Sequence, residues 1–366
     1  MIIKTPQKYI SGADIIRTSG KLIAEYTKNP LIIGSRSALS AVLNELRAGL
    51  KENAVTAENV EIFKGFPSEN QIHKYAQLAK KLNADAIIAA GGGRTLDTAK
   101  AAGEFANIPV ITIPTIAATC AAWAALTIQY DDEGSFVRPR PLKKAPVLII
   151  ADTKIILSAP ERYLFAGVAD TFAKFYEVRP TFERYPESIP LDIAFYSSKV
   201  AFEKLENNVL AALDEAKKDV FGQAAKAVVD SVVYLAGFAG SFQDNTGYYS
   251  FAHPFYHISA RFPNTRHKLH GEKVAYGIIS QLFLEKKDRK EIIDTIRLFR
   301  KYNNAFTLKD IGLSRENTTE LKALADEIRK EFPHVEWSSE EIVNALLEAD
   351  QLTEEVLKKQ GKEEKI

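Results

Sequence analysis

Between residues 30 and 151 the chain alternates short apolar runs with segments of helical periodicity, and this alternation limits the fold more than any other feature. The apolar runs are too short for helices, and several end at glycine or proline, which is typical of buried strands. Strands that alternate with helices predict a parallel, doubly wound α/β sheet with right-handed crossovers. The predicted strands are Pro30–Gly34, Val60–Phe63, Ala84–Ala90, Val110–Ile113 and Val147–Ala151.

The pattern changes after Pro160, where long helical stretches follow one another without strand-like alternation. A chain of 366 residues is also too long for one ordinary core and suggests two domains. We therefore predict an α/β domain at 1–160 and an all-helical domain at 161–366. The predicted helices of the second domain are 161–177, 191–215, 219–242, 270–286, 289–303, 316–330 and 339–358.

The balance of residue types argues against several classes of protein. Apolar residues make up 46% of the chain and the formal net charge is +1, so the basic excess typical of nucleic-acid and membrane-surface proteins is missing. Cys120 is the one cysteine, which excludes an internal disulfide and suits a reducing compartment. The uncharged stretch 106–130 contains Pro109 and Pro114, and we interpret it as buried interior rather than a membrane span. No signal-peptide pattern is visible, so we expect a cytoplasmic protein.

Three consecutive glycines, Gly91, Gly92 and Gly93, join the predicted strand Ala84–Ala90 to a helical segment. Glycine lets the backbone approach a ligand closely, and a helix N-terminus offers free N–H groups to an anion. A tight strand-to-helix turn would need only one glycine. We therefore expect a diphosphate here, although the chain lacks the G-x-G-x-x-G fingerprint.

Small and hydroxyl-bearing residues follow the next strand, from Ile113 to Trp123. Ligands bind at the carboxyl ends of parallel strands, so this segment suits a ligand crevice. Cys120 lies within it, and no charged residue is near in the sequence to activate the thiol. We interpret Cys120 as a small neutral residue rather than a nucleophile.

Four of the six histidines fall between residues 253 and 270. Histidine is the commonest metal ligand and the usual acid/base side chain near neutral pH, and His253 and His257 share a helical face at i,i+4. The alternative is a helix end with solvated histidines. Asp170 is an acid in a small, apolar helical stretch, and alone it suits a hydrogen-bonded buried carboxylate equally well. Together these residues suggest an Asp/His/His metal site with an open fourth position, as in catalytic zinc sites.

These motifs resemble the glycerol dehydrogenase branch of the iron-containing alcohol dehydrogenases, whose fold is similar to that of dehydroquinate synthase. The motifs stand in the family's order across roughly residues 30–285. They are Gly-Gly-Gly-x-x-x-Asp-x-x-Lys at 91–100, Ile-Pro-Thr-x-Ala-x-Thr at 113–119, Tyr130-Asp-Asp-Glu-Gly134, Gly167-x-x-Asp170, His253 and His270-Gly-Glu-Lys-Val-Ala275. The resemblance implies a dinucleotide-binding domain at 1–160 and a metal-binding domain at 161–366.

The resemblance also implies roles for single residues. Asp170, His253 and His270 match the metal ligands, and His257 matches a histidine near the nicotinamide. Arg94 stands at the diphosphate site in place of a more usual lysine or serine. The candidate catalytic residues are His257 and Cys120, and the candidate cofactor-binding residues are Ser35, Arg36, Gly91, Gly92, Gly93, Arg94, Asp97, Thr115, Thr119, Leu126 and Tyr130.

Three departures from the family pattern are informative. Cys120 stands where glycerol dehydrogenases carry an aspartate that binds a polyol hydroxyl, which is similar to a hydroxycarboxylate dehydrogenase subgroup and favours an anionic substrate. Ser35 and Arg36 stand where NAD-using relatives place an acid, which favours NADP over NAD. Lys174 stands where iron-using relatives have a histidine ligand, which favours three-ligand zinc over iron.

The leading hypothesis is therefore a metal-dependent oxidoreductase that transfers hydride between NAD(P)H and a small 2-oxo or 2-hydroxy acid. The alternative within the family is a glycerol dehydrogenase that interconverts glycerol and dihydroxyacetone. Alternatives of another class are a dehydroquinate synthase-like lyase, which would need several basic residues for a substrate phosphate, and an inactive cofactor-binding protein. We also expect a homo-oligomer with no nucleic-acid or membrane partner.

Overall fold

The computed structural model describes residues 2–185, 187–243 and 250–363. The chain packs into two compact units that interleave in the sequence. The first unit comprises Met1–Leu164 and Tyr196–Asp244, and the second comprises Phe165–Phe195 and Asn245–Ile366. These units differ from the predicted division at residue 160, because the segment from Tyr196 onwards returns to the first unit. The boundaries of independently folding domains stay a prediction.

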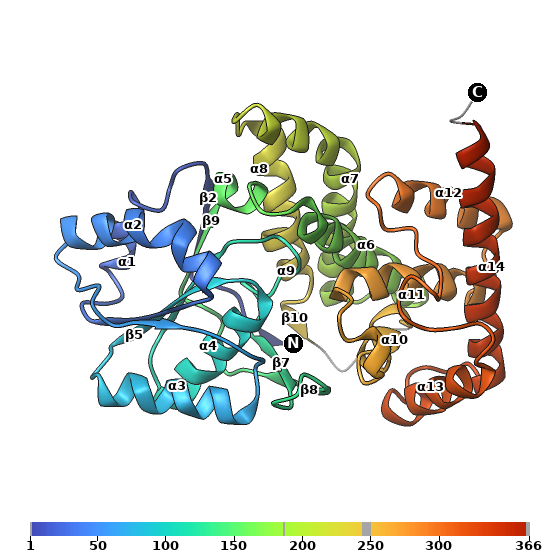
Figure 1. The fold of residues 1–366 in the computed structure, drawn as a ribbon, viewed down its shortest axis with the longest axis horizontal. Coiled ribbons are helices and arrows are strands. Elements are labelled where there is room, and N and C mark those ends of the chain that lie inside the picture. Colours follow the sequence, from blue (N-terminus) through green and yellow to red (C-terminus); the bar gives the residue numbers. More distant parts are fainter. Residues whose placement is uncertain (1, 186, 244–249, 364–366) are drawn as a thin grey trace. The chain divides into compact units, whose positions relative to one another are not determined.

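A six-stranded parallel sheet forms the centre of the first unit (Figure 1). Its strand order is β2-β9-β6-β5-β3-β4. The strands are β2 (Lys8–Gly12), β3 (Pro30–Gly34), β4 (Val60–Ile62), β5 (Ala86–Gly91), β6 (Val110–Pro114) and β9 (Leu148–Asp152). The four inner strands are buried at every position, which explains their continuous apolar runs. All five predicted strands are present, and the predicted doubly wound parallel sheet is confirmed.

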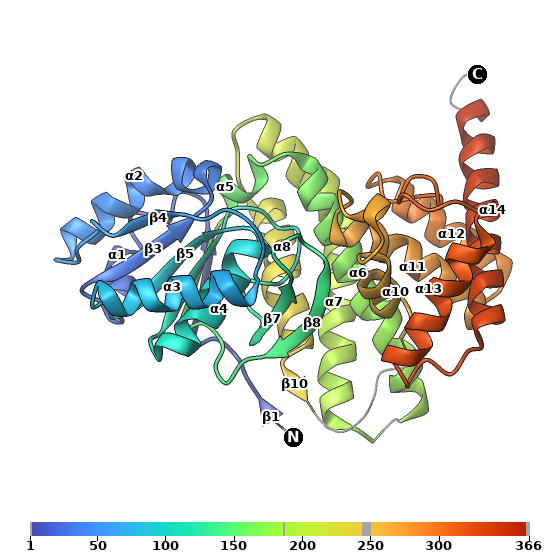
Figure 2. The same ribbon diagram turned by 60° about the horizontal axis from the view of Figure 1, so that its bottom comes forward.

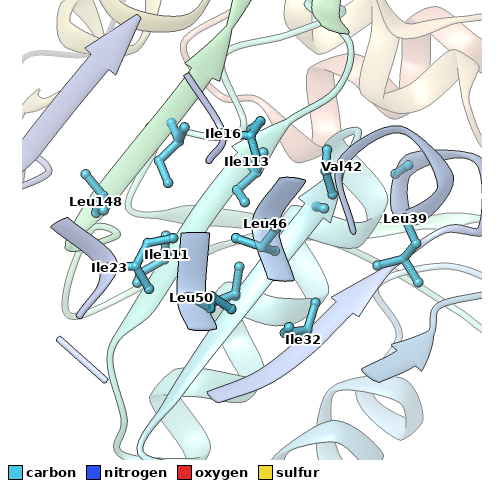
Figure 3. Packing of buried hydrophobic residues seen from close by; sticks show 14 of the residues in the cluster. Ile16, Ile23, Ile32, Leu39, Val42, Leu46, Leu50, Ile111, Ile113 and Leu148 are labelled. Carbon is cyan, nitrogen blue, oxygen red and sulfur yellow. The ribbon is translucent and has the colours of Figure 1, made fainter. Parts of the chain in front are cut away.

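Helices cover both faces of this sheet. Figure 2 shows α1 (Gly20–Ile23) and α2 (Arg36–Glu52) on one face, and α3 (Glu69–Lys81) and α4 (Gly93–Ala106) on the other. On the α2 face, apolar side chains at helical spacing meet alternate residues of the strands (Figure 3). Burying each such side chain contributes roughly 1.5–3 kcal/mol. The members that Figure 3 labels on α2 and the strands are Leu39, Val42, Leu46, Leu50, Ile32, Ile111, Ile113 and Leu148.

Several short strands were not predicted. The edge strand β2 is only half-buried along its length, so it lacks the apolar run that marks the inner strands. An antiparallel hairpin of β7 (Leu126–Tyr130) and β8 (Phe136–Pro141) follows the small-residue loop after β6. Strand β1 (Ile2–Ile3) pairs with β10 (Phe242–Gln243), a two-residue strand inside the region predicted to be helical.

The returning segment packs beside the sheet through helices. It contains most of α7 (Ile189–Lys217) and a helical stretch that was predicted as one helix at 219–242. That stretch is divided into α8 (Gln223–Asp230), a π-helical segment (Ser231–Leu235) and α9 (Ala236–Ala239). Tyr9 of β2 donates a hydrogen bond to Asp230 of α8, with 2.7 Å between the oxygens. Such contacts between β2 and α8 explain why the segment belongs to the first unit.

Helices are the regular secondary structure of the described part of the second unit, which confirms the predicted all-α C-terminal part of the fold. Its helices are α6 (Glu161–Arg184, which begins in the first unit), α10 (Ala252–Ser259), α11 (His270–Leu284), α12 (Arg289–Arg300), α13 (Thr318–Glu331) and α14 (Ser339–Glu363). A Cβ atom at Gly271 would lie 1.9 Å from the carbonyl oxygen of Ala166. Only glycine therefore lets the start of α11 pack this closely on α6. None of the described helices is long and apolar enough to cross a membrane.

Candidate metal centre and cofactor site

Three helices of the second unit bring a carboxylate and two imidazoles together. Asp170 comes from α6, His253 from α10, and His270 is the first residue of α11. The Nε2 atoms of His253 and His270 lie 3.2 Å and 3.0 Å from Oδ1 of Asp170. One ligand atom from each of the three residues lies within 4.8 Å of the others. These are the three residues that the sequence predicted as metal ligands, and the close contact of Gly271 with Ala166 brings α11 and α6, which carry two of them, together.

Glu177 adds a second carboxylate that sequence analysis missed. Its Oε1 accepts a hydrogen bond from the backbone N–H of His253 at 2.8 Å, and its Oε2 bonds Nδ1 of the same residue. A carboxylate on the far nitrogen fixes the ring orientation of a metal-binding histidine. The signal was present in the sequence, because Glu177 follows Asp170 by seven residues and shares its face of α6.

Asp170, His253 and His270 form a triad, and each of the three shifts the pKa values of its neighbours. Burial would raise the pKa of Asp170, but Lys174 and the two histidines hold it well below its usual value. Burial would lower the pKa of His253, but Glu177 and Asp170 raise it to about 9. Burial lowers the pKa of His270, and Asp170 offsets this only in part. Two carboxylates, Glu177 and Asp170, thus lie beside the imidazole of His253, and such negative charges also attract a cation.

The remaining histidines of the cluster have different surroundings. His257 is buried, and its ring stacks on Phe332 with the centroids 5.9 Å apart and lies 6.4 Å from the ring of His253. Burial, and then the positive charges of His253 and His270, hold the pKa of His257 well below its usual value. His257 is therefore a neutral imidazole at physiological pH. His267 is exposed and lies outside the triad.

In the first unit, the predicted cofactor residues gather at the carboxyl ends of three neighbouring strands. The register pairs Gly34 of β3 with Ala90 of β5, and Gly91 of β5 with Pro114 of β6. After β3, the chain forms β4 along one edge of β3 and then crosses back to form β5 along the other edge. The gap between β3 and β5 is thus a topological switch point, which is where open α/β sheets bind ligands.

Gly93 has the geometry expected of a residue that a ligand approaches. It is the first residue of α4, after the N-cap Gly92. A Cβ atom there would lie 3.6 Å from Cβ of Ala121 and 3.7 Å from Oγ1 of Thr119, which are ordinary contacts. The protein's own packing therefore does not require glycine at this position. A ligand anion at the N-terminus of α4 would require it.

Arg94 and Tyr130 both lie beside the aromatic ring of Phe66. The guanidinium carbon of Arg94 is 4.2 Å from the centroid of Phe66, and the ring of Tyr130 is 5.9 Å from the same ring. Gly134 permits this arrangement, because its φ of +89° suits glycine and a Cβ atom would lie 2.3 Å from Phe66. Arg94 is exposed. Its cation is thus held beside the start of α4, where an anion would bind.

Asp97 and Lys100 are buried and bond other parts of the protein. The buried ammonium of Lys100 donates to the carbonyl oxygens of Ala121 at 2.7 Å, Ala124 at 2.9 Å and Leu126 at 2.5 Å. It also lies 2.9 Å from Oδ1 of Asp97, whose Oδ2 accepts the backbone N–H of Ile128 at 3.0 Å. Both carboxylate oxygens are thus engaged within the protein. Asp97 was predicted to bind the cofactor, and the structure instead shows it tying β7 to α4.

The other predicted residues lie around the same strand ends. Thr115 is buried and its N–H bonds the carbonyl of Gly91 at 3.1 Å, while Oγ1 of Thr119 accepts the N–H of Ala121 at 3.2 Å. Ser35 caps α2 through the N–H of Ala38 at 3.3 Å. The side chains of Leu126 and Cys120 are half-buried, and Arg36 is exposed.

Trp123 holds the loop that carries Cys120. Its indole N–H donates to Oγ of Ser241 at 2.9 Å, and its ring packs on Tyr234 of the π-helical segment with the centroids 5.0 Å apart. A Cβ atom at Gly237 would lie 2.4 Å from the Trp123 side chain. Lys100 on one side and Trp123 on the other therefore give this loop a defined conformation.

The chain is similar to known dehydrogenases in sequence and in fold. The family model for iron-containing alcohol dehydrogenases matches residues 6–153. Glycerol dehydrogenase of Escherichia coli O6:H1 (strain CFT073) is 30% identical over 359 residues, which cover 96% of both chains. Hydroxycarboxylate dehydrogenase A of Escherichia coli K12 is 32% identical over 273 residues, which cover 73% of this chain and 74% of the relative. The crystal structure of glycerol dehydrogenase from Schizosaccharomyces pombe matches with a TM-score of 0.88 at 23% identity, and covers 98% of this chain and 93% of that chain.

Proposed function

Because the chain belongs to the iron-containing alcohol dehydrogenase family, in its glycerol dehydrogenase branch, we propose that it transfers hydride between NADPH and a small 2-oxo or 2-hydroxy acid. Family membership makes it a metal-dependent oxidoreductase that acts on a small molecule. The lyase alternative is set aside on that ground. Asp170, His253 and His270 form one cluster, and this argues against an inactive cofactor-binding protein. Self-association into a homo-oligomer stays a prediction.

The donor set fits a divalent metal ion, and we propose zinc. One carboxylate oxygen and two imidazole nitrogens within 4.8 Å of one another are a set that zinc accepts in catalytic sites. Glu177 holds the far nitrogen of His253, as a carboxylate commonly does for a metal-bound histidine. Lys174 supplies no fourth imidazole, which leaves one position for water or substrate.

The glycine-led start of α4 fits a dinucleotide diphosphate, with Arg94 as a further positive charge. Ser35 and Arg36 support NADPH over NADH. Ser35 is the N-cap of α2 and carries no carboxylate. Arg36 is the first residue of that helix, and its positively charged side chain is exposed. An acid here would repel a 2′-phosphate, whereas arginine pairs with it. Titration that shows tenfold tighter NADH binding would contradict this preference.

The proposed chemistry divides the work between the bound groups and the protein. When bound, the metal supplies Lewis-acid polarisation of the substrate's carbonyl oxygen, and the nicotinamide supplies the hydride. Asp170, His253 and His270 hold the ion. His257, neutral and buried, accepts the hydroxyl proton during oxidation of the 2-hydroxy acid and returns it during reduction. Cys120 takes no covalent part and forms a small neutral wall of the substrate pocket.

The observation that carries the substrate class is Cys120. The resemblance places an aspartate of glycerol dehydrogenases at this position, and an aspartate would repel a substrate carboxylate in a low-dielectric pocket. The hydroxycarboxylate dehydrogenase relative supports the same class. The second candidate is glycerol, because the relative that is 30% identical over 96% of the chain is a glycerol dehydrogenase.

The test is a substrate screen of the wild type and the Cys120→Asp variant, in which the oxidation of NADPH or NADH is measured for each substrate. We expect the wild type to reduce 2-oxo acids faster than dihydroxyacetone. Cys120→Asp should lower kcat/KM for the acids by about tenfold or more, since two like charges meet, and raise activity on glycerol. Cys120→Ser, which stays neutral, is the matched control. A wild type that prefers glycerol to every hydroxy acid would show that the chain is a glycerol dehydrogenase.

A further inference from the structure

Gln281 is a fully buried glutamine near the end of α11, and its amide joins three helices of the second unit. Its oxygen accepts hydrogen bonds from the backbone N–H groups of Phe251 at 2.9 Å and Ala252 at 3.3 Å. Its nitrogen donates to the backbone carbonyl of Tyr176 at 3.2 Å and to Oε1 of Glu285 at 2.7 Å. The proposed function gives this residue no role.

Only one orientation of this amide suits its surroundings. The oxygen lies beside two N–H donors, and the nitrogen lies beside two oxygen acceptors. A flipped amide would place donor against donor and acceptor against acceptor at all four contacts. Such mismatched groups are costly in a buried position. The side chain of Gln281 is therefore a specific link, and it holds the start of α10 to α6 through α11.

The bonds from Phe251 and Ala252 hold the start of α10. The first N–H groups of a helix have no partner within that helix, and the apolar side chain of the N-cap Phe251 supplies none. Phe251 and Ala252 donate to Gln281, and the next residue, His253, donates its N–H to Oε1 of Glu177 at 2.8 Å. Three successive N–H groups thus bond side chains of α11 and α6, and these bonds determine where His253 lies.

Gly277 lets α10 approach the face of α11 that carries Gln281. It precedes Gln281 by four residues, and residues at this spacing share a helix face. A Cβ atom at Gly277 would lie 2.8 Å from Cα of Ala252, which is too close for any side chain. The close approach brings the N–H of Ala252 within reach of the amide.

The bond to Tyr176 replaces one that α6 cannot form. In a regular α-helix the carbonyl of Tyr176 would accept a hydrogen bond from the N–H of residue 180. Residue 180 is a proline inside α6, and proline has no N–H. Gln281 donates to this carbonyl instead. The amide thus contacts α6 one residue before Glu177 and α10 one residue before His253.

We propose that Gln281 is a positioning residue of the metal centre. It sets the start of α10 against α6, so that Glu177 meets both the backbone N–H and the imidazole of His253. Gln281 acts through the backbone beside His253 and is not itself a ligand. This inference rests on the proposed metal centre and deepens it, since it names the residue that aligns a ligand with its outer carboxylate.

Cobalt(II) tests the inference, because its visible absorption depends on the geometry of its ligands, whereas zinc has no such absorption. Gln281→Met keeps a long side chain and removes all four hydrogen bonds. We expect it to bind cobalt about tenfold more weakly and with a changed spectrum, because His253 is no longer held on Glu177. Gln281→Asn is a milder change that shortens the amide by one methylene group, and it should weaken cobalt binding in the same direction.

Three further variants separate positioning from a general loss of stability. Gln351→Met, at an exposed glutamine on α14 of the same unit, should bind cobalt as the wild type does. Ile296→Ala removes a fully buried side chain of α12, and should destabilise the protein without changing cobalt affinity or spectrum. The exchange of Gln281→Glu with Glu285→Gln keeps the net charge and an acceptor for the start of α10, and should recover most of the cobalt affinity.

Different results would overturn different claims. If folded Gln281→Met and Gln281→Asn bind cobalt with the affinity and spectrum of the wild type, Gln281 does not position the centre. If Ile296→Ala weakens cobalt binding as much at an equal loss of stability, Gln281 is a structural residue only. If the wild type binds neither cobalt nor zinc, the proposed metal centre fails, and the inference with it.

Discussion

The imidazole of His253 lies between two carboxylates, and this arrangement suits it to the proposed metal centre. Glu177 bonds Nδ1 and Asp170 lies 3.2 Å from Nε2. Asp170 is almost fully buried, whereas 24% of the His253 side chain is exposed. The ligand oxygen is thus fixed deep in the helical packing while the imidazole edge stays accessible to solvent, which suits a site that must admit a substrate.

Glu177→Gln tests the contribution of the outer carboxylate. The amide keeps the size of the side chain but loses the charge that raises the basicity of His253. Metal affinity should fall about 10–100-fold, the usual loss when such a partner is removed. Competition with a chromophoric chelator measures it. Glu336→Gln, at an exposed position of the same unit, should bind metal as the wild type does, and an unchanged affinity of Glu177→Gln would show that Glu177 does not support the ligand.

The burial of Lys273 should make the free energy of unfolding depend on pH. It is only 2% exposed, and burial lowers its pKa from 10.5 to about 7. Its ammonium lies 5.0 Å from the centroid of Tyr256. Between pH 7 and 10.5 the unfolded chain therefore binds a proton that the folded chain does not, so the free energy of unfolding rises with pH across this window. Below pH 7 both states bind the proton, and the destabilisation is complete.

Lys273→Met should therefore be more stable than the wild type at pH 7, and this advantage should shrink by roughly 2 kcal/mol between pH 7 and pH 9. Chemical denaturation at several pH values, with a chelator in every sample, gives the difference. Lys290→Met, an exposed control, should follow the wild type at every pH. If Lys273→Met keeps a constant difference from the wild type, the lysine does not titrate near pH 7.

At the scale of elements, α4 supports two parts of the first unit. Its N-terminus carries Gly93 and Arg94 beside the strand ends, and its interior carries the Asp97–Lys100 pair that holds the loop after β6. One helix thus presents the proposed diphosphate site and fixes the loop with Cys120. The physical link is the buried ammonium, which replaces water as the partner of three backbone carbonyls.

Lys100→Met should remove this link. The change leaves the buried carboxylate of Asp97 without its cation and leaves three carbonyls without a donor. The free energy of unfolding should fall by about 3–5 kcal/mol, as when one partner of a buried ion pair is removed. Denaturant titration measures it. Asp97→Asn combined with Lys100→Met should recover part of the loss, because no buried charge then lacks a partner. Lys81→Met, at an exposed position, should leave the free energy of unfolding unchanged. Wild-type stability of Lys100→Met would contradict the anchoring role.

At the scale of the whole molecule, the two units carry two different proposed ligands. The proposed metal ligands belong to the second unit and the strand-end residues to the first. A ligand at one hundred times its Kd stabilises the protein by about 2.7 kcal/mol, which corresponds to a hundredfold change in the equilibrium for opening.

Hydrogen exchange should therefore separate the ligands by unit. Zinc at one hundred times its Kd should slow exchange up to about a hundredfold in α6, α10 and the start of α11. NADPH should slow it in the segments at 34–38, 91–98 and 115–126. A chelator should reverse the first effect and leave the second. Protection by zinc of the strand ends instead of the three helices would contradict this assignment of ligands to units.

The sequence by itself determined the features that depend on neighbouring residues. Inner strands such as β5 are apolar throughout because both faces are buried, and α2 shows its apolar face at helical spacing, so both could be recognised locally. The edge strand β2 is half-buried throughout and the hairpin of β7 and β8 has mixed burial, and the local pattern did not reveal them. Glycine chemistry and the resemblance to a family indicated the strand-end residues and the triad.

Only the tertiary structure decided which of these residues meet. Asp170 is separated by 83 residues from His253 and by 100 from His270, and no local pattern determines whether such distant side chains approach. The packing of three helices decides it, through the close contact of Gly271 with α6. The same holds for Glu177, and for Asp97, whose motif suggested a ligand contact. The direction of a side chain depends on what packs against it, and that is a property of the folded chain.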